Sequence, residues 1–186
     1  EEDYNRPYCA LQPPVPLQVL DVGTGSGCIA VTLASDLRNS AVTAWDISGD
    51  ALLIARENVH EWGVRVELKM EDALHPSASA MQQQFDVIVS NPPYICEKER
   101  IAMAKNVLAY EPETALFVPD DDPLRFYRAI AEYGAQVFSE EGTLYFETNP
   151  IYINKVKEML SSLGYKQIEE RKDQFGKLRF IKAIRP

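Results

Sequence analysis

A short glycine-rich segment near the start of the sequence has the composition of a ligand-binding loop. It reads Asp21-Val22-Gly23-Thr24-Gly25-Ser26-Gly27 and follows an apolar run, so its backbone amides can approach a ligand closely. Its G-x-G-x-G spacing differs from the dinucleotide fingerprint G-x-G-x-x-G, whose third glycine would fall on Cys28. Asp21 would repel a pyrophosphate but can bind an ammonium group. We therefore expect a ligand with an amino-acid moiety, the alternative being a tight turn without a ligand.

Two further acidic positions follow the next two expected strands. Asp46 comes 19 residues after Gly27, where a carboxylate can accept hydrogen bonds from both hydroxyls of a ribose. Asp72 and Ala73 follow the third strand, where an acid and a small side chain can meet the amino group and the ring face of an adenine. The alternative for either aspartate is a solvated turn residue. We assign Asp46, its neighbour Ile47, Asp72 and Ala73 to the same expected site as the glycine loop.

The segment Asn91-Pro92-Pro93-Tyr94 is the most informative for chemistry. Two consecutive prolines restrict the backbone, so the Asn91 side chain and the Pro92 carbonyl are predicted to point one way as a pair of acceptors. An amide or exocyclic amino nitrogen is a poor nucleophile because its lone pair is delocalised. Two acceptors that hold both N–H bonds would direct this lone pair at a methyl carbon, and the Tyr94 ring would pack against the substrate plane. We predict Asn91, Pro92 and Tyr94 as catalytic residues and all four as substrate-binding residues.

These motifs follow apolar segments that are typical of strands in one α/β sheet. Four strands are expected at about residues 17–22, 41–46, 64–68 and 85–90, with apolar residues at helical spacing between the first three. Such alternation predicts a doubly wound, Rossmann-like sheet with right-handed crossovers. The motifs all lie at the carboxyl ends of its strands, where open α/β sheets bind ligands.

The second half of the chain is predicted to complete a seven-stranded, mostly parallel sheet. Its last two strands flank the loop Asp173-Gln174-Phe175-Gly176, which predicts an antiparallel C-terminal hairpin. A long loop is expected at 91–121, followed by a helix that begins at Asp122-Pro123 and presents Tyr127, Ile130, Ala131 and Phe138. A second helix is expected to begin at Asn149-Pro150 and to present Ile153, Val156, Leu160 and Leu163. The strands are expected at 142–147, 165–171 and 178–184.

Charge argues against a nucleic acid as the direct substrate. Nineteen Lys and Arg residues against 28 Asp and Glu give a net charge of −9, which repels phosphates. Basic residues gather only late in the chain, where they alternate with acids, and we interpret them as a solvated strand face. They are Lys166, Arg171, Lys172, Lys177, Arg179, Lys182 and Arg185.

The remaining composition predicts a single cytoplasmic domain. The length of 186 residues fits one core, with residues 1–16 as a proline-rich lead-in and residues 17–186 as the domain. Three widely spaced cysteines argue against a disulfide framework and favour a reducing compartment. The cysteines and two histidines show no metal-ligand spacing, so no metal is expected. No apolar run approaches the roughly 18 residues that span a bilayer, so no membrane partner is expected.

The sequence resembles a known family over about residues 17–186. Asp21–Gly27 is similar to the cofactor loop of S-adenosylmethionine-dependent methyltransferases, and Asn91–Tyr94 is similar to the substrate motif of amino-methyltransferases. More narrowly, the segments 89–95 and 110–116 together resemble the HemK/PrmC family, the peptide chain release factor glutamine methyltransferases. The second of these segments, Tyr110-Glu111-Pro112-Glu113-Thr114-Ala115-Leu116, narrows the resemblance.

The resemblance implies a complete reaction. The cofactor would be S-adenosylmethionine, the substrate the glutamine in the Gly-Gly-Gln loop of class 1 release factors, and the products N5-methylglutamine and S-adenosylhomocysteine. By position, the residues implied in cofactor contact are Gly23, Thr24, Gly25, Ser26, Gly27, Asp46, Ala73 and Asn91. Asn91, Pro92, Pro93 and Tyr94 would hold the glutamine.

Two departures from the family and three alternatives accompany this expectation. Glu147 is followed by Thr148-Asn149-Pro150 instead of a Gly- and Gln-containing helix start, and the family's N-terminal helical domain is expected to be absent from this chain. One alternative is a methyltransferase of a ribosomal-protein glutamine. Another is an N6-adenine or N2-guanine methyltransferase of DNA or RNA, since the same geometry suits any planar amino group. The third is a non-catalytic cofactor-binding module.

Overall fold

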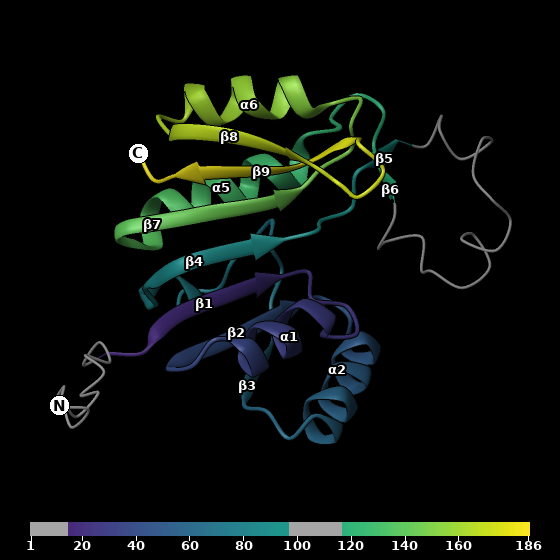
Figure 1. The fold of residues 1–186 in the computed structure, drawn as a ribbon. Coiled ribbons are helices and arrows are strands. Elements are labelled where there is room, and N and C mark those ends of the chain that lie inside the picture. Colours follow the sequence, from purple (N-terminus) through teal and green to yellow (C-terminus); the bar gives the residue numbers. More distant parts are fainter. Residues whose placement is uncertain (1–14, 97–116) are drawn as a thin grey trace, which may run out of the picture.

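Seven strands form a single twisted sheet in the computed structural model, which describes residues 15–96 and 117–186 (Figure 1). Their order across the sheet is β3-β2-β1-β4-β7-β9-β8. The first five are parallel to one another, and β9 is antiparallel to both β7 and β8. The bounds are β1 (Leu17–Val22), β2 (Ser40–Asp46), β3 (Val66–Met70), β4 (Phe85–Ser90), β7 (Phe138–Glu147), β8 (Lys166–Lys172) and β9 (Leu178–Ile184).

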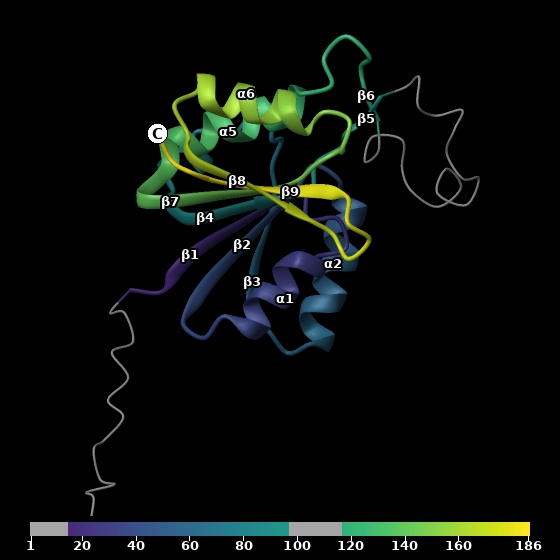
Figure 2. The ribbon, with the colours of Figure 1, turned by 45° about the horizontal axis from the view of Figure 1, so that its top comes forward.

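Helices cover both faces of this sheet. Figure 2 shows α1 and α2 on one side and α5 and α6 on the other, and α5 also contacts the short 3-10 helix η1. A two-stranded parallel sheet, β5 with β6, lies apart from the main sheet. The bounds are α1 (Cys28–Asp36), α2 (Gly49–Glu61), η1 (Ala80–Gln82), β5 (Ile95–Cys96), β6 (Phe117–Val118), α5 (Arg125–Val137) and α6 (Ile153–Ser162).

The central strand β1 explains why the sheet forms its core here. Val19, Leu20, Asp21 and Val22 are all buried, because β1 has a neighbouring strand on each edge and helices over both faces. Leu20 and Val22 belong to the large apolar cluster that includes residues of α5 and α6, whereas Val19 packs with Ala30 of α1. A buried charged residue in such a strand needs a specific reason, which makes Asp21 stand out.

The predicted fold is confirmed in its strands and in its C-terminal hairpin. The sheet has seven strands, and the last two form the expected antiparallel pair. Ser48 caps α2 as expected, because its side chain accepts a hydrogen bond from the Ala51 amide at 3.2 Å. The third strand begins at Val66, two residues later than predicted. Trp62, expected on the inner face of α2, is 66% exposed.

The two later helices begin farther along the chain than predicted. The Asp122 carboxylate pairs with the Arg128 guanidinium through two 3.0 Å hydrogen bonds, and α5 starts only at Arg125. Asn149 Oδ1 accepts from the Ile151 amide at 3.0 Å in a turn that precedes α6. Phe138, assigned to the first of these helices, is instead the first residue of β7.

Several predictions fall on residues outside the described ranges. The segment 110–116 and most of the predicted loop 91–121 are among them, although β5 and β6 lie at the two ends of that loop. The domain boundary at residue 16 stays a prediction. Within residues 15–96 and 117–186, no helix is long and apolar enough to cross a membrane.

Candidate active site

The glycine loop joins β1 to α1 and leaves an uncovered backbone surface. Gly23 and Gly25 have φ angles of 72° and 56°, and a Cβ added at either would meet nothing within 4 Å. Gly27 also has a positive φ, 82°, and in addition a Cβ there would lie only 3.1 Å from the Cβ of Ala55 on α2. The loop is therefore packed tightly against α2 at one end and open at its centre, as a backbone that receives a ligand must be.

Asp21 is a fully buried carboxyl group at the base of this loop. Its Oδ2 accepts hydrogen bonds from the Thr24 hydroxyl at 2.6 Å and from the Ala30 amide at 3.2 Å. Among the described residues, no donor reaches its Oδ1, which is also buried. Burial raises the pKa of Asp21 to about 6, with a smaller upward contribution from Asp46, and the two hydrogen bonds act in the opposite direction. A buried carboxyl with one unused oxygen suits a cationic ligand group.

Asp46 links the end of β2 to the glycine loop. Its Oδ2 accepts from the Gly25 amide at 2.8 Å, and its Oδ1 accepts from the Ser48 amide at 2.9 Å. Each oxygen retains a second lone pair, so the carboxylate can still accept from hydroxyl groups of a ligand. Ile47, beside it, is an apolar side chain that is 64% exposed, so it is accessible for contact with the flat surface of a ligand.

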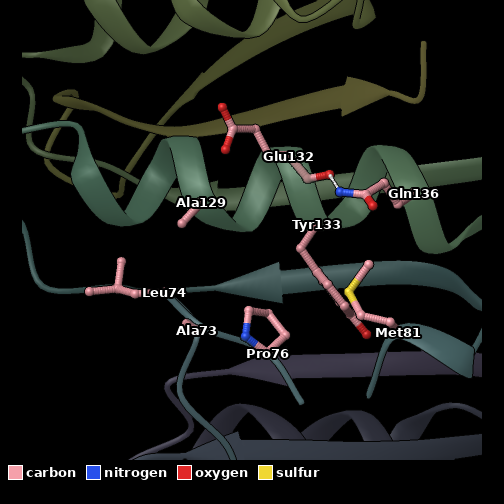
Figure 3. Close-up of a pocket in the computed structure, with 8 residues that line it drawn as sticks. All are labelled: Ala73, Leu74, Pro76, Met81, Ala129, Glu132, Tyr133 and Gln136. Carbon is pink, nitrogen blue, oxygen red and sulfur yellow. Dashed lines mark hydrogen bonds between the residues drawn. The ribbon is translucent and has the colours of Figure 1, made fainter. Parts of the chain in front are cut away.

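Asp72 and Ala73 lie in the loop that follows β3. Asp72 Oδ1 accepts from the Leu74 amide at 2.8 Å, so the carboxylate shapes its own turn. Ala73 lines a pocket of about 140 Å³ that Figure 3 shows between this loop and α5. Tyr133 projects from α5 towards the pocket and donates from its hydroxyl to the Ala80 carbonyl at 2.9 Å. Tyr133 thus joins α5 to η1, which follows this loop, and Ala73 itself packs against the apolar core that includes residues of α5.

The Asn91-Pro92-Pro93-Tyr94 segment leaves the carboxyl end of β4. Ser90, which precedes it, is buried and donates from its hydroxyl to the Val22 carbonyl at 2.6 Å, which fixes the segment against the end of β1. Asn91 is exposed, Pro92 is buried, and Tyr94 is half-buried. The segment therefore has a rigid, buried proline and an accessible amide side chain.

The predicted site residues meet at one edge of the sheet. In the parallel register, Val22 of β1 pairs with Trp45 of β2 on one side and with Ser90 of β4 on the other. The residues that follow these three positions are the glycine loop, Asp46 and Asn91. The Gly23 and Thr24 amides both donate to the Trp45 carbonyl at 2.9 Å, so the loop is tied directly to β2. The Asp72 loop enters one strand farther out, beyond β3.

The structure also reveals a cluster of charged side chains, Glu147, Arg179 and Asp173, beside Tyr94. The Tyr94 hydroxyl lies 3.4 Å from Glu147 Oε1 and 3.5 Å from Arg179 Nη1, and Arg179 Nε donates to Asp173 Oδ2 at 3.2 Å. Burial, followed by the charge of Glu147, raises the pKa of Tyr94, while Arg179 acts to lower it. Asn149 also donates to the Tyr94 carbonyl at 3.5 Å.

The interpretation of the late basic residues as a solvated face is wrong for Arg179. Its side chain is only 30% exposed and lies beside Tyr94, 85 residues away in the sequence. The reason is the pairing of β9 with β7, which sets Phe180 opposite Glu147 and brings the start of β9 to the site edge. The sequence predicts the C-terminal hairpin, but it does not predict that β9 pairs with β7. Without that strand order, Arg179 cannot be placed beside Tyr94.

A family model described as the methyltransferase small domain matches residues 10–116, more than half of the chain. The chain belongs to the methyltransferase small domain family. In this family member, the glycine loop, Asp46 and the Asn91 segment all fall within the matched residues. No group of His, Cys, Asp and Glu side chains with metal-binding geometry occurs in the described part of the chain.

Two curated relatives carry the same name, release factor glutamine methyltransferase. The protein of Bacteroides thetaiotaomicron is 48% identical over 169 residues, which cover 90% of this chain and 60% of the relative. The protein of Flavobacterium psychrophilum is 43% identical over 167 residues, which cover 90% of this chain and 58% of the relative. This methyltransferase chain therefore spans less than two thirds of the length of these two relatives.

A solved structure shows the same fold at low sequence identity. It is the 16S rRNA N2 G1207 methyltransferase RsmC of T. thermophilus, in complex with AdoMet and guanosine, with a TM-score of 0.63 and 17% identity. The match covers 92% of this chain and 38% of that chain. The predicted fold class, a Rossmann-like sheet of the class I methyltransferases with a C-terminal antiparallel hairpin, is confirmed.

Proposed function

We propose that this chain transfers a methyl group from S-adenosylmethionine to the side-chain amide nitrogen of a glutamine, in the Gly-Gly-Gln motif of class 1 peptide chain release factors. The observation that carries the proposal is the Asn91–Tyr94 segment, held at the end of β4 directly beside the glycine loop. The name and the 48% identity of the Bacteroides thetaiotaomicron relative support the same substrate. A partner of this kind places the reaction in the cytoplasm.

The residues at the end of β1 and β2 fit the cofactor. Asp21 Oδ1, buried and without a donor among the described residues, is placed to accept from the ammonium of the methionine moiety. The open backbone at Gly23 and Gly25 leaves room for that moiety, and Asp46 retains lone pairs for the ribose hydroxyls. When bound, S-adenosylmethionine supplies an electrophilic methyl group on a sulfonium sulfur; the electrons of the broken C–S bond would stay with S-adenosylhomocysteine, and the methylated nitrogen would release one of its two protons to solvent. In the same proposal, Thr24, Ser26, Ile47, Asp72, Ala73 and Asn91 complete the cofactor site.

The chain's own residues orient the acceptor amide. Asn91 Oδ1 and the Pro92 carbonyl accept one N–H bond each, which turns the nitrogen lone pair out of conjugation and towards the methyl donor. Pro92 and Pro93 supply the rigidity, because their φ angles are fixed by their rings. The Tyr94 ring packs against the amide plane and excludes water from it.

A nucleic-acid base is the weaker candidate for the acceptor. The same acceptor pair would suit an adenine or guanine amino group, but the net charge of −9 opposes the approach of a polynucleotide. Arg179, a basic side chain beside the site, lies close to both Glu147 and Asp173. Its charge is thereby offset locally, which favours an uncharged acceptor such as a glutamine amide.

Methyl transfer with labelled S-adenosylmethionine tests this proposal. The acceptors are a purified class 1 release factor and the same factor with its Gly-Gly-Gln glutamine changed to alanine. Label on the first factor alone is expected. Label on both factors, or on neither when S-adenosylhomocysteine binding has been demonstrated, would contradict the proposed acceptor for this chain.

A further inference from the structure

Arg179 is the second residue of β9 and has three polar partners from separate parts of the chain. Its guanidinium approaches the Tyr94 hydroxyl at 3.5 Å, Glu147 Oε1 at 3.8 Å and Asp173 Oδ2 at 3.2 Å. These partners follow β4, end β7 and follow β8, respectively. Arg179 is therefore the side chain at which the proposed acceptor segment meets the C-terminal hairpin.

The backbone of Arg179 is anchored as firmly as its side chain. Its carbonyl accepts from the Thr148 amide at 2.6 Å and from the Thr148 hydroxyl at 3.1 Å. Thr148 is fully buried and directly follows Glu147. The two ends of the Arg179–Glu147 contact are thus fixed to each other through neighbouring backbone, independently of their charges.

Asp173 holds the guanidinium from the other side. Its Oδ2 accepts from Arg179 Nε, while its Oδ1 accepts from the Phe175 and Lys177 amides, both at 2.9 Å. The same carboxylate thus closes the hairpin turn and orients the arginine. This arrangement differs from an ordinary surface pair such as Arg171–Glu169, whose side chains are 74% and 50% exposed, against 30% for both Arg179 and Glu147.

We propose that Arg179 is a positioning residue of the acceptor site, which holds the Tyr94 ring and the Glu147 carboxylate in one arrangement. This inference rests on the proposed methyl transfer, in which Tyr94 packs against the acceptor amide. The phenol hydroxyl lies between a carboxylate and a guanidinium, so the cation fixes both groups at once. Contacts of 3.4 to 3.8 Å are long for hydrogen bonds, and catalytic contacts of this kind commonly shorten when the substrate binds.

Loss of the cation would leave the Glu147 carboxylate half-buried and unbalanced. A carboxylate in that position turns towards water, and Tyr94 then loses a partner on each side of its hydroxyl. The ring remains attached to the rigid Pro92-Pro93 backbone but is free to rotate. The acceptor amide would lose one wall of its site, whereas Asp21 and the glycine loop, which contact none of these groups, would be unaffected.

NMR spectra of the protein with isotope-labelled tyrosine test the positioning directly, without any reaction. The ring signal of Tyr94 is assigned by its loss in Tyr94→Phe. We expect that signal to shift in Arg179→Met and to shift less in Arg179→Lys, which keeps the charge without the planar fork. The matched control is Arg185→Met. Arg185 follows the last residue of β9, at the end of the strand opposite to Arg179, and donates to the Phe138 and Ser139 carbonyls at the start of β7. An unmoved Tyr94 signal in Arg179→Met would overturn the proposal.

Steady-state kinetics then test the consequence for the acceptor. Arg179→Met should reduce kcat/KM for the release factor by about tenfold or more, with a raised KM, and leave S-adenosylhomocysteine affinity unchanged. Arg179→Lys should recover part of the loss, and Arg185→Met should show none. Equal loss of cofactor affinity would contradict a role confined to the acceptor. If the wild-type protein methylates no release factor, the proposed function fails, whereas the NMR comparison still decides whether Arg179 positions Tyr94.

Discussion

Replacement of Asp21 by asparagine should stabilise the ligand-free protein while it destroys cofactor binding. The carboxyl group is completely buried, and burial raises its pKa from 3.8 to about 6. Between those two pH values the unfolded chain releases the proton that the folded chain retains. The Asp21 carboxyl therefore contributes its full stabilisation of the folded state below about pH 4. This contribution is lost as the pH rises through about 6.

The size of the effect follows from the difference between the two pKa values. A difference of about 2.2, at about 1.36 kcal/mol for each pH unit, corresponds to about 3 kcal/mol lost at neutral pH. The asparagine side chain carries no charge, so Asp21→Asn should raise the free energy of unfolding at about pH 8 by up to about 3 kcal/mol more than at about pH 4. The unused Oδ1 position would then hold an amide group, which cannot bind an ammonium group as a carboxylate does. We expect affinity for S-adenosylhomocysteine to fall by at least about a hundredfold.

Urea denaturation at the two pH values, with wild type and Asp21→Asn in parallel, measures this double difference. The control is Asp122→Asn, whose effect should be nearly the same at the two pH values. Arg128 holds the pKa of the Asp122 carboxyl below its usual range, so the stability contributed by that group is lost only as the pH falls below about 4. An Asp21→Asn effect that is the same at both pH values would refute the account of Asp21 as a buried acid poised for a cation.

Three further variants separate the roles of the site residues. Asn91→Ala should abolish methyl transfer while S-adenosylhomocysteine binding, measured by calorimetry, stays within about a few fold of wild type; unchanged turnover would contradict the acceptor-pair mechanism. Gly27→Ala should cost about 1–3 kcal/mol of stability, measured by thermal unfolding, because its φ is 82° and the new Cβ meets Ala55 at 3.1 Å. Ala55→Gly in that background removes the 3.1 Å contact but leaves the Ala55 Cα 3.3 Å from the new Cβ and costs about 1 kcal/mol of helix propensity, so it should not restore wild-type stability. Asp173→Asn keeps an oxygen for the hairpin amides, so it should raise the acceptor KM without unfolding the protein, and should add little when Arg179 is already methionine.

Local sequence patterns were sufficient for the strands and for the motifs that follow them. Val19–Val22 and Phe85–Ser90 are short apolar runs that end at a glycine or an asparagine, and the carboxyl-edge rule for α/β sheets brings those ends together without further information. The hairpin at Asp173–Gly176 was also local, since the turn residues lie between two short strands. These features depend on neighbours in the sequence, which is why they could be predicted.

Features that depend on side-chain pairing, on the residue at which a helix ends, or on strand order could not be predicted. The start of α5 was misplaced because the Asp122 carboxylate is engaged by Arg128, six residues away, instead of capping the helix. Trp62 has the spacing of an inward residue, yet it lies after the last turn of α2 and points to solvent. Arg179 was grouped with exposed basic residues because only the pairing of β9 with β7 carries it to Tyr94.

The buried state of Asp21 occupies an intermediate position between these two cases. Its place before the glycines suggested an ammonium ligand from sequence alone. The observation that one oxygen has two donors and the other, within the described residues, has none required the three-dimensional arrangement of Thr24 and Ala30. The structure thereby adds a measurable prediction for Asp21, namely how its contribution to the free energy of unfolding changes with pH.

Mass spectrometry of a release factor after incubation with this protein and S-adenosylmethionine tests the central claim most directly. The account predicts one added methyl group, localised by fragmentation to the glutamine of the Gly-Gly-Gln motif, and none with the Asn91→Ala variant. A methyl group on any other residue, or an unmodified glutamine after incubation with a protein that binds the cofactor, would contradict it.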